Sequence, residues 1–147
     1  MIIRRVARFN EKIYRAVVNL IPQLDGACPL PDREHIKEVL KNRNTFMLVA
    51  VTEEGVIAGM LTMASYKIPT GTKFWIDDVI VDSGYRGRKV GLSLLEEAIS
   101  VARKNGARSV DLTSRPFRHE ANSLYKKLGF LKRETNVYRF LFDIEQT

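Results

Sequence analysis

Residues 79–92 combine a strand pattern, a basic loop with glycines and the start of a helical pattern. The apolar, β-branched run ends at Val81, and Gly84 and Gly87 lie in the loop that follows. Backbone N–H groups at such a loop and in the first turn of a helix bind phosphate groups well. Three basic side chains add positive charge at the same point: Arg86, Arg88 and Lys89. The segment therefore predicts a site for an anionic, phosphorylated ligand.

Two common phosphate-binding motifs do not fit this segment. A P-loop requires G-x-x-x-x-G-K-[ST], which residues 84–89 do not supply. A dinucleotide-binding fingerprint requires G-x-G-x-x-G, whereas Gly84, Gly87 and Gly91 are spaced G-x-x-G-x-x-x-G. The ligand is therefore expected to be held by a different kind of loop.

Two adjacent acids, Asp77 and Asp78, interrupt the apolar strand pattern before the loop. Successive side chains of a strand face opposite sides of a sheet, so we expect these two to do the same. One of them would bind a cationic amine or relay its proton through water, and Asp78 is preferred. The alternative is that both acids are solvated near a turn or hydrogen-bond to a loop.

The composition indicates one globular domain with a core of its own, because 45% of the 147 residues are hydrophobic. No apolar run is long enough to cross a bilayer, and charges interrupt residues 1–8 where a signal peptide needs an apolar stretch. We therefore expect a cytoplasmic protein that does not bind membranes. Two histidines and the single Cys28 make a Cys/His zinc site improbable, so no metal is expected.

The formal net charge of +7 fits a nucleic-acid partner, an anionic small ligand or simple solubility. The basic residues are spread along the chain, and no basic block is interleaved with aromatic residues. A nucleic-acid partner is therefore not expected.

Hydrophobic periodicity and turn residues predict alternating helices and strands. The expected helices cover residues 11–24, 32 to 42–44, 87 or 88 to 105, and 118–128; the expected strands cover residues 2–8, 45–51, 56–66, 73–81, 109–113, 130–133 and 137–142. Gly59 inside a strand pattern predicts a bulge or a close backbone approach. Three meandering strands before a β-α-β crossover indicate an α/β (α+β) fold with a mixed, mostly antiparallel sheet of about seven strands and helices on both faces.

Three segments resemble the GNAT superfamily of acyl-CoA-dependent N-acetyltransferases. Residues 85–91, Y-R-G-R-K-V-G, resemble its Q/R-x-x-G-x-G/A signature, and residues 75–82 look like the strand that precedes it. Residues 121–130 resemble a family ending, here as N-x-x-Y-x-x-L-G-F, and the order of elements matches over nearly the whole chain. Lys89 stands where the signature usually has glycine. A positive φ there would cost about 1 kcal/mol, whereas a helical Lys89 would leave the loop amides available.

The resemblance implies a single GNAT-like domain over residues 1–147 with acetyl-CoA as cosubstrate. It also implies a sheet splayed between the strand at 79–81 and the strand at 109–113, with the pantetheine arm between them. Asn122 would contact that arm, and the Tyr125 hydroxyl would point at the thioester sulfur. The implied backbone contacts are Val79, Ile80 and Val81 for pantetheine and Arg86, Gly87, Arg88, Lys89, Val90 and Gly91 for the pyrophosphate.

These implied roles fit the chemistry of thioester aminolysis, which needs a neutral amine, alignment, a donor for the carbonyl oxygen and a proton for the thiolate. Asn122 and Tyr125 are three residues apart and share a helix face. A phenol with a pKa of about 10 is a candidate acid for a thiolate, although Tyr125 is alternatively a core aromatic.

The hypothesis is therefore an N-acetyltransferase that acts directly on a primary amine of a small molecule, peptide or protein. The alternative is a non-catalytic CoA-binding sensor or assembly module. A homodimer is conceivable from exposed strand edges near the C-terminus.

Overall fold

The computed structural model describes residues 1–142, and the chain divides into two compact units, Met1–Thr113 and Ser114–Thr147. In order, the first unit contains β1 (Ile2–Arg5), α1 (Glu11–Leu24), α2 (Arg33–Lys41), β2 (Thr45–Val51), β3 (Ile57–Ile68), β4 (Gly71–Val81), a 3-10 turn (Ser83–Tyr85), α3 (Val90–Lys104) and β5 (Ser109–Asp111). The second unit contains α4 (His119–Lys127).

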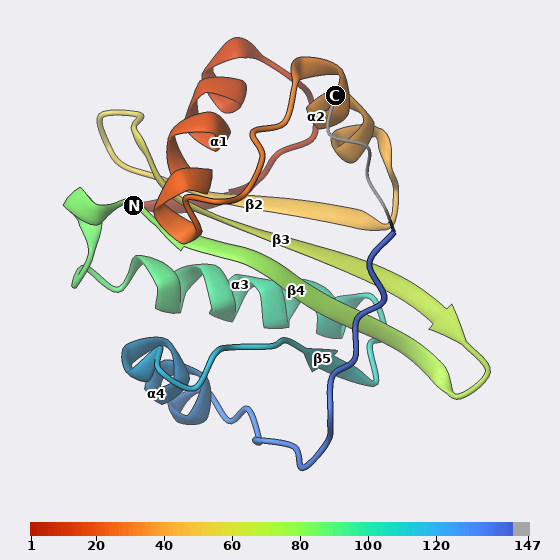
Figure 1. The fold of residues 1–147 in the computed structure, drawn as a ribbon. Helices are drawn as coiled ribbons and strands as arrows, with labels where there is room; N and C mark the ends of the chain where they lie inside the picture. Colours follow the sequence, from red (N-terminus) through yellow and green to blue (C-terminus); the bar gives the residue numbers. More distant parts are fainter. Residues whose placement is uncertain (143–147) are drawn as a thin grey trace. The chain divides into compact units, whose positions relative to one another are not determined.

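The sheet of the first unit is mixed and mostly antiparallel, as the sequence predicts. Its strand order is β1-β2-β3-β4-β5, in which the first four strands pair antiparallel and β5 joins β4 in parallel. The parallel pairing follows from the crossover through α3, which brings the chain back to the same end of the sheet. Helices α1 and α2 lie on one face of the sheet and α3 on the other (Figure 1).

Helices α1 and α2 begin where their capping residues predict. The Asn10 carboxamide oxygen accepts a hydrogen bond from the Ile13 N–H at 2.9 Å, and the Asp32 carboxylate accepts one from the His35 N–H at 2.8 Å. Pro22 lies inside α1, which ends two residues later at Leu24. The apolar stripes of both helices bury one core against the sheet: Ile13, Val17, Leu20, Ile36, Met47, Val49, Met60 and Ile80.

The opposite face of the sheet is covered by α3, which buries Val90, Leu94, Leu95, Ala98 and Ala102. Gly59 of β3 allows this close packing, because a Cβ atom there would lie 3.1 Å from the Val90 side chain and 2.8 Å from the Ile80 carbonyl oxygen. The pairing of β2 with β3 also shifts register beside this glycine, between Ala50 and Val51. Both features predicted for Gly59 are thus confirmed.

The prediction of about seven strands is wrong, since the described residues form five. Residues 130–133 and 137–142, which belong to the second unit, are not strands. The aromatic and β-branched residues there express a preference for extended backbone, but a strand also needs a hydrogen-bonded neighbour. The aromatic side chains of residues 137–142, namely Tyr138, Phe140 and Phe142, are exposed. Among the described helices, none combines the length and apolarity needed to cross a membrane.

Candidate functional site

The last part of β4 has a strand neighbour on one side only. Its pairing with β5 is confined to residues 73–75, whereas its pairing with β3 continues to Ile80 and Val81. Within the described residues, no strand pairs with the β5 side of residues 76–81. Backbone groups of Val79 to Val81 therefore have no described strand on that side, and the splay of the sheet at this point stays a prediction. An extended ligand can hydrogen-bond to such an edge in the manner of an added strand.

A bulge lies at Asp78 and Val79 of β4, directly after Asp77. Thr62 pairs with Asp77 and Met60 pairs with Ile80, so two residues of β4 oppose one residue of β3. Asp78 is one of these two, and its φ of 52° is left-handed. The expected placement of Asp77 and Asp78 on opposite faces assumes regular alternation, which this bulge interrupts. Bulges re-aim side chains and free backbone groups, and they are frequent beside active sites.

The environment of the bulge changes the acidity of Asp78. Its pKa is raised above the ordinary 3.8, first because the surrounding protein partly desolvates the carboxyl and second because the Asp77 carboxylate lies beside it. The side chain nevertheless remains exposed. An accessible carboxyl with a raised pKa is a stronger base than an ordinary aspartate, which suits proton transfer.

The basic loop after β4 contains two left-handed residues, Gly87 with φ 76° and Lys89 with φ 61°. The prediction that α3 begins at Gly87 or Arg88 is therefore wrong, because neither left-handed residue can belong to a right-handed helix. Helix α3 begins at Val90, and Lys89 is its N-cap residue with ψ 23°. The alternative of a helical Lys89 is likewise wrong, so this lysine occupies a conformation that favours glycine.

The N-terminus of α3 offers open hydrogen-bond donors. No side chain caps it, and its first helical hydrogen bond runs from the Ser93 N–H to the Lys89 carbonyl oxygen at 3.0 Å. The N–H groups of the first turn therefore have no partner inside the helix. Residues 86–89, with their three cations, are exposed beside them. These features fit an anion such as a pyrophosphate. In the described part of the chain, no cluster of three or more His, Cys, Asp or Glu side chains is arranged to hold a metal.

A group of hydrogen bonds centred on Asp82, at the start of the loop, could not be predicted from the sequence. The Asp82 carboxylate accepts hydrogen bonds from the Gly84 N–H at 2.9 Å, from Gln23 Nε2 at 3.1 Å and from Asn19 Nδ2 at 3.4 Å. The bond from Gln23 is the first cause that holds the pKa of Asp82 below 3.8, and the bond from Gly84 is the second. No spacing rule links residues so far apart in sequence, although the short polar Asp82 after a strand is a turn signal.

The second unit carries Asn122 and Tyr125 on α4, as predicted. Asn122 Nδ2 donates to the carbonyl oxygens of Arg115 at 3.0 Å and Pro116 at 3.4 Å, so it secures the segment that leads into the helix. Tyr125 is 8% exposed and meets the Phe130 ring edge to face, with 5.9 Å between centroids. Burial raises the pKa of the Tyr125 phenol, an effect that Arg118 partly opposes.

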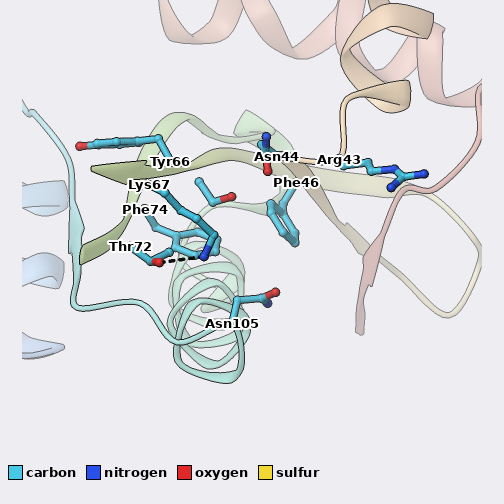
Figure 2. A pocket seen from close by; sticks show the side chains of 9 residues that line it. Arg43, Asn44, Phe46, Tyr66, Lys67, Thr72, Phe74 and Asn105 are labelled. Atoms are coloured by element: carbon cyan, nitrogen blue, oxygen red, sulfur yellow. Dashed lines mark hydrogen bonds between the residues drawn. The ribbon is translucent and has the colours of Figure 1, made fainter. Parts of the chain in front are cut away.

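A separate pocket of about 430 Å³ lies at the other end of β4 from the loop. Figure 2 shows Lys67 donating to the Thr72 hydroxyl at 3.2 Å, while Arg43 extends away from the other labelled residues. Phe46 and Phe74 form an aromatic pair at 5.5 Å and are both buried, which gives Phe74 a core role. None of the residues proposed from the sequence as catalytic or cosubstrate-binding lines this pocket.

Known proteins resemble this chain in sequence and in fold. A family model described as the acetyltransferase (GNAT) family matches residues 11–130. An uncharacterized N-acetyltransferase of Methanocaldococcus jannaschii is 39% identical over 59 residues, which are 40% of this chain but only 26% of that protein.

Among solved structures, an aminoglycoside acetyltransferase from an uncultured soil metagenomic sample has a TM-score of 0.84 at 20% identity, over 96% of this chain and 95% of its own. An acetyltransferase of Trypanosoma brucei has a TM-score of 0.78 at 24% identity, over 95% and 99%. These identities support the shared fold alone. Since the family match takes in every described helix and every described strand except β1, the chain belongs to the GNAT family of acetyltransferases.

Proposed function

We propose that this protein is an N-acetyltransferase that uses acetyl-CoA and acts directly on a primary amine of a small molecule, peptide or protein. One arrangement carries the proposal: an edge of β4 that has no strand neighbour among residues 1–142 leads into a basic loop and then into the uncapped N-terminus of α3. This arrangement supports a ligand that has an extended polar arm at one end and phosphates at the other. The cytoplasmic location and the possible homodimer remain predictions.

The residues present fit acetyl-CoA, which when bound supplies an activated acetyl group as a thioester. The main chain of Val79, Ile80 and Val81 would pair with the pantetheine arm. The N–H groups of residues 86–91 would hold the pyrophosphate, with Arg86, Arg88 and Lys89 supplying positive charge. Asn122 would contact the arm through its side-chain amide.

Two proton transfers are needed, one to a general base and one from a general acid. The acceptor amine must lose a proton to become a nucleophile, and the raised pKa of Asp78 supports it as the group that accepts this proton, directly or through water. Asp77 is the second candidate for the same role. The buried Tyr125 phenol stays protonated at neutral pH because burial raises its pKa, so it keeps a proton for the departing thiolate.

The direct test is to mix the purified protein with acetyl-CoA and a panel of primary amines and to follow the release of free thiol. We expect release that depends on both the protein and the amine. Calorimetry with acetyl-CoA alone first measures whether the cosubstrate binds, and a lack of binding would overturn the proposal. Tight binding without turnover on a broad panel would instead favour the non-catalytic CoA-binding module.

A further inference from the structure

We infer that Gln23 is a positioning residue that fixes the basic loop from outside, by tying helix α1 to its first residues. This inference rests on the proposed function, because the loop is the proposed pyrophosphate site. Gln23 lies in the last turn of α1 and is 59 residues from Asp82 in sequence.

Both ends of the Gln23 carboxamide are used. Its Nε2 donates to the Asp82 Oδ2 at 3.1 Å, and its Oε1 accepts from the Ser83 N–H at 2.8 Å. A carboxamide can donate to an acid and accept from the next N–H with one planar group, whereas a carboxylate can only accept and an ammonium or guanidinium group can only donate. Asn19, one helical turn earlier, adds a longer bond of 3.4 Å to the same carboxylate oxygen. The contact is therefore specific in chemistry as well as in place.

Asp82 connects helix α1 to the sheet and to the 3-10 turn through its backbone and side-chain hydrogen bonds. Its N–H donates to the Ala58 carbonyl oxygen of β3 at 2.9 Å, and its own carbonyl oxygen accepts from the Tyr85 N–H at 2.8 Å. Its second carboxylate oxygen accepts from the Gly84 N–H at 2.9 Å. The sheet, the 3-10 turn and helix α1 thus meet at one residue.

Within the loop, the Arg88 guanidinium lies 5.2 Å from the centroid of the Tyr85 ring, a contact with the 3-10 turn. Residues 86–89 are all exposed, and two of them are left-handed. No buried side chain of this segment anchors it, so its course depends on its two ends, α3 on one side and Asp82 on the other. Loss of the Gln23 contact should therefore leave the sheet intact and spread the directions of the loop N–H groups. The expected consequence is weaker binding of acetyl-CoA, without a change in the chemical step.

The test exchanges the donor and acceptor roles of the pair. Gln23→Glu places a carboxylate against the Asp82 carboxylate at nearly constant volume. Adding Asp82→Asn to it restores a donor opposite an acceptor, while the carboxylate at position 23 still accepts from the Ser83 N–H. Arg15→Gln, on the same helix, is the matched control because it changes the net charge by the same one unit away from Asp82.

We expect Gln23→Glu to raise the Kd and KM for acetyl-CoA about tenfold, equivalent to about 1.4 kcal/mol, the net contribution of one or two hydrogen bonds. The double variant should recover to within about threefold of the original protein, and kcat at saturation should hold throughout. Hydrogen exchange at the Ser83 and Gly84 N–H groups should quicken in Gln23→Glu and slow again in the double variant. Gln23→Met, which keeps the length but removes both bonds, should repeat the rise in Kd.

Two failures are distinguishable. If the unsubstituted protein does not bind acetyl-CoA, the proposed function fails, whatever the exchange rates show. If the unsubstituted protein binds and turns over, but Gln23→Glu and Gln23→Met bind equally well, the inference about Gln23 is overturned and the proposed function stands. An equal loss in the single and double variants would also overturn it, because a role based on this pair requires the rescue.

Discussion

The carbonyl oxygen of Ile80 lies 2.8 Å from the position that a Cβ atom would occupy on Gly59. The same position is 3.1 Å from the Val90 side chain and 3.3 Å from the Leu94 side chain. Gly59 therefore lets β3 approach both the open part of β4 and the first turns of α3. The end of β4 and the start of α3 form the part of the proposed acetyl-CoA site that lies in the first unit. They can both approach β3 closely because position 59 has no side chain.

Gly59→Ala should destabilise the protein by about 1–3 kcal/mol, because the obstructing Ile80 atom belongs to the backbone and cannot rotate away. The measurement is the free energy of unfolding in denaturant. Gly26→Ala is the control, since a Cβ atom there would meet nothing within 4 Å, and its effect should stay within about 0.5 kcal/mol. Equal unfolding midpoints for the two variants would contradict the close approach.

Elements whose signals are local were predicted well. Asn10 and Asp32 cap the helices that the apolar spacing indicates, and β2 spans the predicted residues Thr45–Val51. Capping, periodicity and turn chemistry act within a few residues, so a sequence expresses them directly.

Three features could not be predicted, because they depend on conformation or on partners. The residue type of Lys89 does not itself indicate a left-handed backbone, although the glycine usual at this position of the family signature raised that alternative, and α3 begins only at Val90. The mostly apolar residues 137–142 have the composition of a strand but no strand neighbour among the described residues of their unit. In the candidate site, the contact of Gln23 with Asp82 joins distant residues and becomes visible only once α1 is packed on the sheet.

The left-handed Lys89 makes a prediction about stability. Lys89→Gly should stabilise the protein by about 1 kcal/mol, because glycine adopts a φ of 61° without the clash that a Cβ atom makes. Lys89→Ala is the matched control, since it removes the ammonium group but keeps the Cβ atom. It should leave the stability nearly unchanged. Thermal unfolding of the three proteins checks this, and equal shifts for both substitutions would mean that charge, and not conformation, is the cause.

The same pair of variants separates charge from conformation in binding. If the Lys89 ammonium group attracts phosphate, both substitutions should weaken acetyl-CoA binding to a similar extent, and the loss should shrink as salt is added. Calorimetry at two ionic strengths measures this. A loss in Lys89→Ala alone would show that the unstrained backbone of glycine offsets the loss of the charge.

Tyr125→Phe should reduce kcat by about 10²–10⁴-fold if the phenol protonates the departing thiolate. The KM for acetyl-CoA should change little, because the ring and its edge-to-face contact with Phe130 are retained. Tyr138→Phe is the control, since this exposed hydroxyl lies elsewhere in the same unit. An unchanged kcat in Tyr125→Phe would assign Tyr125 to packing.

The raised pKa of Asp78 makes a prediction about the pH dependence of catalysis. A base must be ionised to act, so kcat/KM should rise with pH through a pKa that lies above the ordinary 3.8 of an aspartate. Asp77→Asn removes the second cause of the shift and should move this limb of the profile to lower pH. Asp78→Asn should abolish the limb and most of the activity. A limb that persists in Asp78→Asn would assign the base to another group.

Asp78→Asn should also stabilise the folded protein at neutral pH. Because the pKa of Asp78 is higher in the folded state than in the unfolded state, the folded state binds the proton more tightly. The stabilisation from the protonated Asp78 carboxyl is complete below the pKa of this group in the unfolded chain. It is lost as the pH rises through the higher pKa of the folded protein. At pH 7 the carboxyl is therefore ionised, and its charge opposes folding. The gain should be below about 1 kcal/mol because solvent screens the exposed side chain, and asparagine tolerates the left-handed φ of this position. Unfolding at pH 7 and at pH 3 checks the sign, since the gain should vanish at pH 3; a variant destabilised at pH 7 would show that the carboxylate is stabilising where it stands.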